Sequence, residues 1–292
     1  MKTCIRSFAL LAIALAASVT AIPAQQQAPA AGGTRIYNTV KQKLQQGRQV
    51  VGATIGIPDA EVYCAIANSG FDFTWIEMQH STLSYTDVAR MIFACKGAPA
   101  IPYVRVPDAT EGDIQKATDM GALGIIVPMV DTVEKAENAV KFAKYPPLGR
   151  RSQGSGQYGA IWGDDYRRTA NDNIMIVAMI ENPAGVAIVD KIAAVPGVDV
   201  VFVASTDLGS FSGLRQGDAK YEALVTAVLD TTTKAGRKVG GPLAWKDTRQ
   251  GYSFFQGPSE TALLRAGSRT TLGGQPAAGQ PRGVAPIEGT ER

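Results

Sequence analysis

Short apolar runs rich in β-branched residues recur along the chain, and they alternate with segments whose apolar residues follow helical spacing. Most of the runs are apolar throughout, which is typical of parallel strands that are buried on both faces. The predicted strands are residues 50–57, 73–77, 101–106, 124–127, 174–180, 200–203, 238–242 and 252–256. Eight strands that alternate with helices predict a closed (β/α)8 barrel, the TIM-barrel fold, in preference to an open sheet.

Helical periodicity fills most of the intervals between these strands, and glycine often follows a periodic segment, as it does at helix ends. The predicted helices are residues 60–69, 85–96, 111–120, 132–144, 183–194 and 221–235. A further helix, residues 35–46, is predicted before the first strand. The last two units are weak, because residues 245–250 offer barely one turn and residues 258–266 form only a short final element.

The N-terminal segment has the pattern of a secretory signal peptide. Lys2 and Arg6 form a positive start, a short apolar stretch follows, and small residues flank cleavage points after Ala21 or Ala24. We therefore predict a signal peptide at residues 1–24 and export to the periplasm or the exterior. The apolar stretch is too short to span a bilayer with ease, and an uncleaved N-terminal anchor is the alternative.

The remainder of the chain divides by composition into three parts. Residues 25–34 are predicted to be a flexible spacer, and residues 35–266 carry the barrel pattern. Residues 267–292 are rich in Gly, Pro, Ala, Gln and Arg and have no periodicity, which predicts a disordered tail.

Composition and charge narrow the classes of partner. The chain has 292 residues, of which 45% are hydrophobic, enough to bury the core of one barrel domain. Its formal net charge of +3 falls to +1 when Lys2 and Arg6 leave with the signal peptide. No basic run is present, so we expect no nucleic-acid partner and, after signal cleavage, no membrane partner.

Two cysteines remain after signal cleavage. Cys64 and Cys95 both lie in predicted helices among apolar neighbours, and we expect two buried free thiols, with a disulfide as the alternative. The chain has a single histidine and no pair of closely spaced cysteines, which excludes a structural zinc site.

Charged residues stand where predicted strands end, and in this fold the chemistry is built at the C-terminal ends of the strands. The second strand ends at Glu77 and is followed closely by His80, and the third ends with Arg105. Glu181 follows the fifth strand and Asp207 follows the sixth. Because burial of an unpaired charge is costly, these side chains need partners or a function.

The residue types suggest a metal site that binds an anionic substrate. Glu181 and Asp207 follow adjacent strands and are oxygen ligands suited to Mg²⁺ or Mn²⁺. Arg105 offers a planar fork for a carboxylate, and His80 can exchange a proton near neutral pH. The alternatives are an internal ion pair between Glu181 and Arg105 and a purely structural imidazole at His80.

Several segments, in the same order, resemble the HpcH/HpaI aldolase family. The resemblance is carried first by residues 70–80, which are similar to the family's second-strand signature. Further similar segments are residues 104–107, 121–130, 145–151, 179–183, 195–199 and 207–208. The similarity runs from residue 36 to residue 266, and several motifs in order are far more specific than any one of them.

The resemblance implies a metal-dependent carbon–carbon lyase. It implies cleavage of a 4-hydroxy-2-oxo acid to pyruvate and an aldehyde through a metal-stabilised enolate. His80 then matches the acid/base histidine, Arg105 the arginine that holds the 2-oxo acid, and Glu181 and Asp207 the metal ligands. The implied cofactor is Mg²⁺ or Mn²⁺, with Co²⁺ as a further option, and the implied assembly is a homo-oligomer, a hexamer by analogy.

Three departures from the family pattern affect the expected site. Glu77 stands where the family commonly has Asp, and Gln79 where it commonly has Glu, so we include both as further site residues. Ala204 and Ser205 replace a Gly-Pro pair, in a turn whose backbone N–H groups are expected to line the site, and we assign Ser205 and Thr206 to substrate binding. Two alternatives stay open: an oxaloacetate-type decarboxylase, and a secreted protein that binds metal and 2-oxo acid without turnover.

Overall fold

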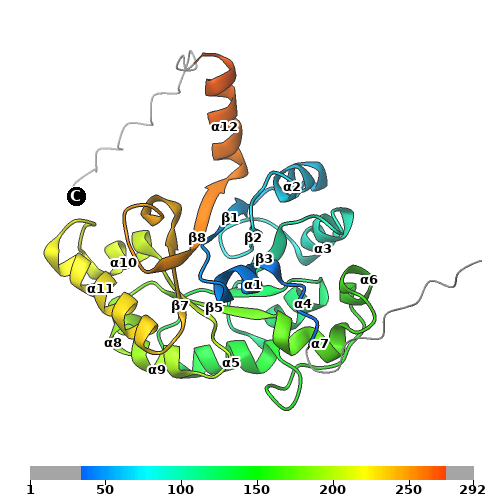
Figure 1. Ribbon diagram of the computed structural model, residues 1–292, viewed down its shortest axis with the longest axis horizontal. Helices are drawn as coiled ribbons and strands as arrows, with labels where there is room; N and C mark the ends of the chain where they lie inside the picture. The colour runs from blue at the N-terminus through cyan, green and yellow to red at the C-terminus, as the bar shows by residue number, and fades with distance from the viewer. Residues whose placement is uncertain (1–33, 274–292) are drawn as a thin grey trace, which may run out of the picture. The chain divides into compact units, whose positions relative to one another are not determined.

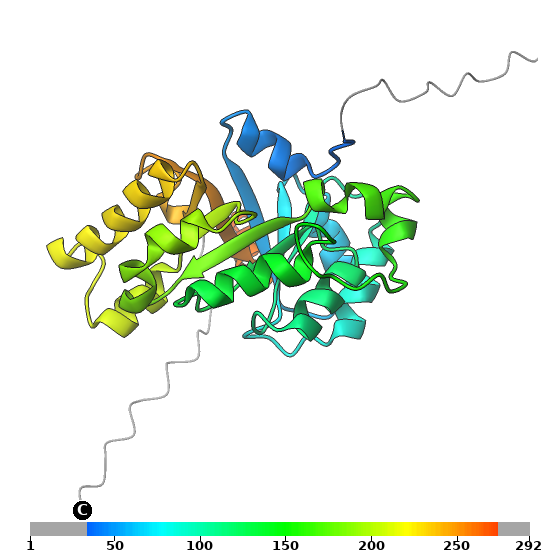
Figure 2. The ribbon, with the colours of Figure 1, turned by 90° about the horizontal axis from the view of Figure 1, so that it is seen from below.

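A computed structural model describes residues 34–273, and these residues form a closed barrel of eight parallel strands. Each strand pairs with the next along the chain, and the last pairs with the first, so the barrel has no free edge (Figures 1 and 2). The strands are β1 (Val50–Ile55), β2 (Phe73–Glu77), β3 (Ile101–Arg105), β4 (Gly124–Val127), β5 (Met175–Ile180), β6 (Val200–Val203), β7 (Lys238–Pro242) and β8 (Tyr252–Ser259). The predicted TIM barrel is confirmed.

Helices surround the barrel and connect its strands. They are α1 (Thr39–Gln45), α2 (Ala60–Ala67), α3 (Tyr85–Ala94), α4 (Glu111–Asp119), α5 (Val133–Ala143), α6 (Tyr158–Trp162), α7 (Tyr166–Asn173), α8 (Pro183–Ala187), α9 (Val189–Ala194), α10 (Ser205–Ser212), α11 (Ala219–Lys234), the 3₁₀ turn η1 (Leu243–Trp245) and α12 (Glu260–Thr271). Many of these helices begin at an N-cap residue whose side chain accepts a hydrogen bond from a backbone N–H of the first turn. For example, Ser84 and Asp87 form a reciprocal capping box at α3.

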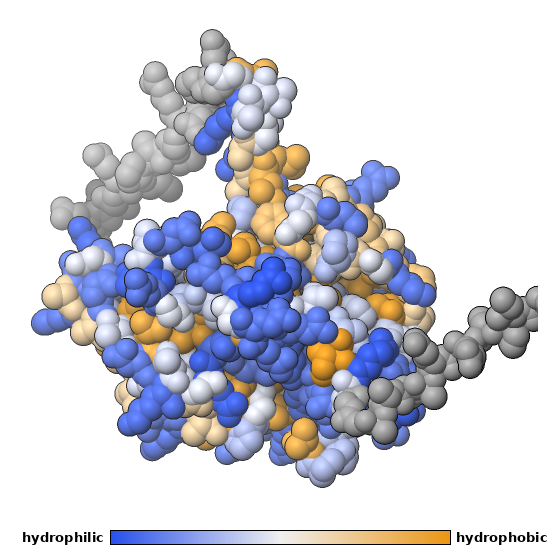
Figure 3. All heavy atoms as spheres, viewed as in Figure 1, coloured by the Kyte–Doolittle hydropathy of each residue, from blue (hydrophilic) through white to orange (hydrophobic). Residues whose placement is uncertain are grey.

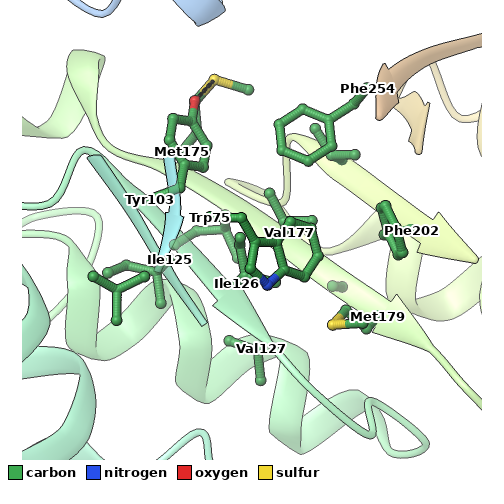
Figure 4. Close-up of a cluster of buried hydrophobic side chains, with 14 of the residues drawn as sticks. Trp75, Tyr103, Ile125, Ile126, Val127, Met175, Val177, Met179, Phe202 and Phe254 are labelled. Atoms are coloured by element: carbon green, nitrogen blue, oxygen red, sulfur yellow. Dashed lines mark hydrogen bonds between the residues drawn. The ribbon is translucent and has the colours of Figure 1, made fainter. Parts of the chain in front are cut away.

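Large side chains fill the interior of the barrel, so it is a packed core and not a pore. Trp75, Phe202 and Phe254 meet inside it from three different strands (Figure 4). Gly124 has no side chain because a Cβ there would overlap the ring of Tyr103 on the neighbouring strand. The floor beneath the C-terminal strand ends is therefore apolar and closed.

The structure corrects several predicted boundaries. The helix predicted at residues 183–194 is two helices that meet at Ile188, and α6, α7 and α10 were not predicted. The tail was predicted to begin at residue 267, but α12 continues to Thr271. Ser259 caps its start by accepting a hydrogen bond from the Ala262 N–H, and Leu, Ala and Arg in its middle favour a helix. The predicted signal peptide, almost all of the spacer and the tail beyond residue 273 lie outside the described residues.

The expectation of two free thiols is wrong. Cys64 on α2 and Cys95 at the end of α3 form a disulfide, with their Cα atoms 5.4 Å apart. Helices α2 and α3 pack side by side on the outside of the barrel, and this brings the two cysteines within the distance that a disulfide requires.

Within residues 34–273, no helix is both long enough and apolar enough to cross a membrane. The last helix nevertheless exposes apolar side chains. Leu264 on α12 is 62% exposed, and Leu272 directly after the helix is 63% exposed; Figure 1 shows the helix extending away from the barrel. Figure 3 shows orange, apolar residues along it.

Candidate functional site

The predicted site residues gather at the mouth of the barrel, around a buried arginine. Glu77 and Arg105 are direct neighbours across β2 and β3, and Glu181 follows β5. The Arg105 Nη1 group lies 3.1 Å from Glu77 Oε2, and its Nη2 group lies 3.5 Å from Glu181 Oε1. All three residues are at most 7% exposed. The ion pair that the sequence left open as an alternative is thus present in the structure.

Glu77 accepts hydrogen bonds through both of its carboxylate oxygens. Oε1 accepts from the backbone N–H groups of Gln79 and His80, at 2.9 and 3.1 Å. Oε2 accepts from the Trp75 indole at 3.2 Å and from Arg105. Four donors fill the usual acceptor capacity of a carboxylate, so Glu77 has little left for a metal or a substrate.

Glu181 is the most deeply buried acid of this group, and its two oxygens differ. Oε1 accepts the Met129 N–H at 3.0 Å and faces Arg105, while Oε2 has no hydrogen-bond partner among the described residues. Burial raises the pKa of Glu181, and the nearby charge of Asp207 adds to the rise, against the Met129 N–H, Arg105 and His80. Glu181 Oε2 is therefore a free oxygen ligand in a region that disfavours a further negative charge.

Asp207 lies in the first turn of α10, directly after β6. This helix has no side-chain cap, and within residues 34–273 the N–H groups of Ser205, Thr206 and Asp207 have no hydrogen-bond partner. Ser205 is buried, and its carbonyl accepts from the Tyr221 hydroxyl, while Thr206 is exposed. Unpaired N–H groups at the start of a helix favour an anion.

His80 and Gln79 lie in the turn after β2. The His80 side chain is exposed, and its backbone N–H is held by Glu77. The Gln79 Oε1 atom is buried without a partner in the described part of the chain. His80 is close enough to Glu181 for its charge to lower the pKa of that carboxyl group, so both belong to one mouth.

The mouth carries more negative than positive charge. Three carboxylates, Glu77, Glu181 and Asp207, face the single guanidinium of Arg105, which leaves two negative charges when His80 is neutral. Within the described residues, no group of three or more His, Cys, Asp or Glu side chains is arranged as a metal cage. Two free carboxylates fit the needs of Mg²⁺ or Mn²⁺, which commonly take only one or two and leave the rest to substrate and water.

The sequence did not reveal two parts of this arrangement. Met129 has a positive φ of 51°, which is rare outside glycine and points its N–H at Glu181. Trp75 was given no role in the predicted site, although its indole N–H donates to Glu77. A Met in a left-handed turn has no sequence signal, whereas a Trp two residues before a strand-end acid is a signal that could be used.

Comparisons with known proteins show the family to which the chain belongs. Residues 58–250 match the family model described as HpcH/HpaI aldolase/citrate lyase. A hydroxypyruvate/pyruvate aldolase of Rhizorhabdus wittichii is 30% identical over 244 residues, which cover 80% of this chain and 97% of that protein.

Two crystal structures with similar folds add to this comparison. The first is an HpcH/HpaI aldolase/citrate lyase family protein from Burkholderia cenocepacia, with 28% identity and a TM-score of 0.73; the match covers 81% of this chain and 98% of that one. The second is the citrate synthase SbnG, with 31% identity and a TM-score of 0.69; the match covers 80% of this chain and 96% of that one.

Proposed function

The chain belongs to the HpcH/HpaI aldolase/citrate lyase family and is a lyase, and from this premise we propose that it cleaves a 4-hydroxy-2-oxo acid to pyruvate and an aldehyde. Relatives named hydroxypyruvate/pyruvate aldolase support this choice of product. The observation that carries the proposal is the barrel mouth itself, where a buried arginine, two carboxylates with free oxygens and an exposed histidine come together.

We propose that Glu181 and Asp207 hold the divalent cation that the reaction needs. Glu181 Oε2 and the Asp207 carboxylate have no hydrogen-bond partners within residues 34–273, and the mouth has an excess of negative charge. When bound, Mg²⁺ or Mn²⁺ would polarise the 2-oxo group and stabilise the negative charge that develops as the carbon–carbon bond breaks.

Arg105 is proposed to hold the substrate carboxylate. Its Nη1 group is fixed by Glu77, but its contact with Glu181 is long at 3.5 Å. Its Nε atom is buried without a partner in the described residues, so this donor of the guanidinium still lacks an acceptor, which a ligand or water would supply. The unpaired N–H groups of Ser205 and Thr206 are proposed to add hydrogen bonds to the same anion.

His80 is proposed to move the proton. In the cleavage direction, the imidazole takes the proton of the 4-hydroxyl group, and that oxygen becomes the aldehyde oxygen as the C3–C4 bond breaks. The electron pair of this bond passes to the enolate of pyruvate, which then takes up a proton at C3 to give pyruvate. The same proton can return in the synthetic direction. The exposed side chain at the rim suits this role, because a group that exchanges protons with solvent must reach it.

Export from the cytoplasm is also proposed. The N-terminal sequence pattern motivates it, and the Cys64–Cys95 disulfide supports it, because such bonds persist mainly in oxidising compartments. N-terminal sequencing of the native protein should find a start near residue 22 or 25. A native protein that retains Met1 in the cytosol contradicts this proposal.

The test of the proposed function is pyruvate release, followed by a coupled assay, from a panel of 4-hydroxy-2-oxo acids. The protein is stripped with EDTA and assayed with and without Mn²⁺, and oxaloacetate is included in the panel. We expect metal-dependent pyruvate release from at least one hydroxy-oxo acid. Release from oxaloacetate alone favours the decarboxylase, and no release from any substrate contradicts the proposal.

A further inference from the structure

Glu77 lies between the two groups that are proposed to bind and deprotonate the substrate. One oxygen of its carboxylate holds the turn that carries His80, and the other holds Arg105. We propose that Glu77 is a positioning residue that links this turn to Arg105. The inference rests on the proposed function of the site.

The geometry favours this role over a catalytic one. Glu77 is 7% exposed, and each oxygen accepts two hydrogen bonds at 2.9–3.2 Å. A carboxylate that accepts four hydrogen bonds has little acceptor capacity left for a substrate or a metal. Trp75 adds rigidity, because its indole is fully buried in the barrel core (Figure 4). The indole N–H donates to the same oxygen as Arg105.

The link has a direct consequence for the guanidinium. Glu77 and Arg105 are paired in register across β2 and β3, so their side chains point the same way from neighbouring strands. Glu77 takes the Nη1 group and leaves Nη2 and Nε directed elsewhere. The substrate carboxylate then meets a fork of fixed orientation instead of a mobile side chain, which lowers the entropy lost on binding.

The experiment replaces Glu77 by Gln, which has one acceptor oxygen and one NH₂ group. The amide oxygen can serve the turn or the Arg105 side, but not both. We expect kcat/KM for the active hydroxy-oxo acid to fall about tenfold or more, as when a hydrogen bond to a charged group is lost. Glu77→Asp keeps both oxygens and the charge, and should recover activity to within about threefold of wild type.

The control is Glu222→Gln, which breaks a second Glu–Arg pair, with Arg249, on the outer helix α11. It should leave kcat/KM unchanged. A Glu77→Gln enzyme that matches this control overturns the proposal. A double-mutant cycle with Arg105→Gln tests whether Glu77 acts through Arg105. If it does, Glu77→Gln should lower kcat/KM little further in the Arg105→Gln background, and full additivity of the two effects overturns the proposal.

A second readout does not depend on turnover. The Trp75 indole N–H resonance, identified by its loss in Trp75→Phe, should shift in Arg105→Gln, because both donors share Glu77 Oε2. An unchanged resonance contradicts the link. If wild type releases no pyruvate, the proposed function fails, and this resonance still decides the positioning role. If Glu77→Gln does not fold, the indole resonance in Arg105→Gln decides the proposal by itself, with the same two outcomes.

Discussion

His80 is exposed at the rim of the mouth, and its backbone is held by Glu77. If it moves the substrate proton, His80→Ala should lower turnover by roughly 10²–10⁴-fold. Metal affinity should stay nearly intact, because the proposed ligands are Glu181 and Asp207. Steady-state kinetics and a Mn²⁺ titration of the same variant check both points. Thr82→Ala, at an exposed position in the same segment, is the control; loss of metal or unchanged turnover in His80→Ala means that its role is different.

Lys144, at the end of α5, is a buried cation that is not one of the strand-end residues of the site. Its ammonium group donates to the carbonyls of Asn171, at 2.7 Å, and Ile174. Burial lowers the pKa of Lys144 to about 8, and Asp199 opposes the effect. The folded protein therefore binds this proton less tightly than the unfolded chain, in which the usual value is 10.5.

The sign of the resulting pH dependence follows from linkage. Between pH 7.5 and 9.5 the unfolded chain holds more protons at Lys144, so the free energy of unfolding should rise with pH, by about 2 kcal/mol. Denaturant unfolding at several pH values measures this rise. Lys144→Met should lack it. If the stability of the wild type stays constant or falls over this pH interval, the pKa of Lys144 is not lowered in the folded protein.

The sequence predicted which charged residues gather at the strand ends, but not which of them contact one another. The alternation of elements placed Glu77, Arg105, Glu181 and Asp207 at strand ends on one face, and the structure brings them together. From the sequence only Glu181 was considered as an ion-pair partner of Arg105, whereas in the structure both Glu77 and Glu181 contact it. Only the strand register and the turn at Gln79–His80 decide that Glu77 holds Nη1 and that Glu181 makes the weaker contact.

At the scale of elements, strands were easier to predict than the helices that carry function. Apolar β-branched runs predict buried strands regardless of their partners. Helix α10 was missed because its sequence, Ser-Thr-Asp-Leu-Gly-Ser-Phe-Ser, is rich in residues that favour caps and turns over helix interiors. Its position directly after β6, and not its propensity, keeps it helical. The disulfide was missed for a similar reason, since it depends on how α2 and α3 pack.

The disulfide joins α2 to α3 and closes a loop that contains β2 and the His80 turn. Its cysteines are 31 residues apart, for which chain entropy predicts a stabilisation of about 3–4 kcal/mol. The double variant Cys64→Ser/Cys95→Ser should have a free energy of unfolding that is lower by about 3–4 kcal/mol. Reductant should have the same effect on wild type and none on the double variant. Equal stability of wild type and double variant contradicts a structural role for the bond.

At the scale of the whole molecule, α12 needs a partner. A helix of 12 residues that is almost entirely exposed is marginal in water, and Leu264 within it and Leu272 directly after it face solvent. Between α12 and α2 lies a mainly apolar groove of about 660 Å³, lined in part by Ile66 and Leu263. We propose that a second copy of the chain covers this region, and a homo-oligomer, a hexamer by family analogy, remains the expected assembly.

Light scattering at micromolar concentration should therefore give a mass above that of the monomer. Leu264→Glu should reduce this mass, because it places a charge in the proposed interface. Leu148→Glu is a matched control, since Leu148 is also 62% exposed but lies in the loop after α5. A monomeric wild type, or equal masses for the two variants, contradicts this role of α12.

Glu181 and Asp207 are proposed to bind one divalent cation together at the barrel mouth. Calorimetric titration of EDTA-stripped protein with Mn²⁺ tests it most directly, with Glu134→Gln, an exposed acid at the start of α5, as the control. We expect one Mn²⁺ per chain for wild type and control, and much weaker binding for Glu181→Gln and Asp207→Asn. Equal binding by wild type and Glu181→Gln would contradict the metal site and the mechanism built on it.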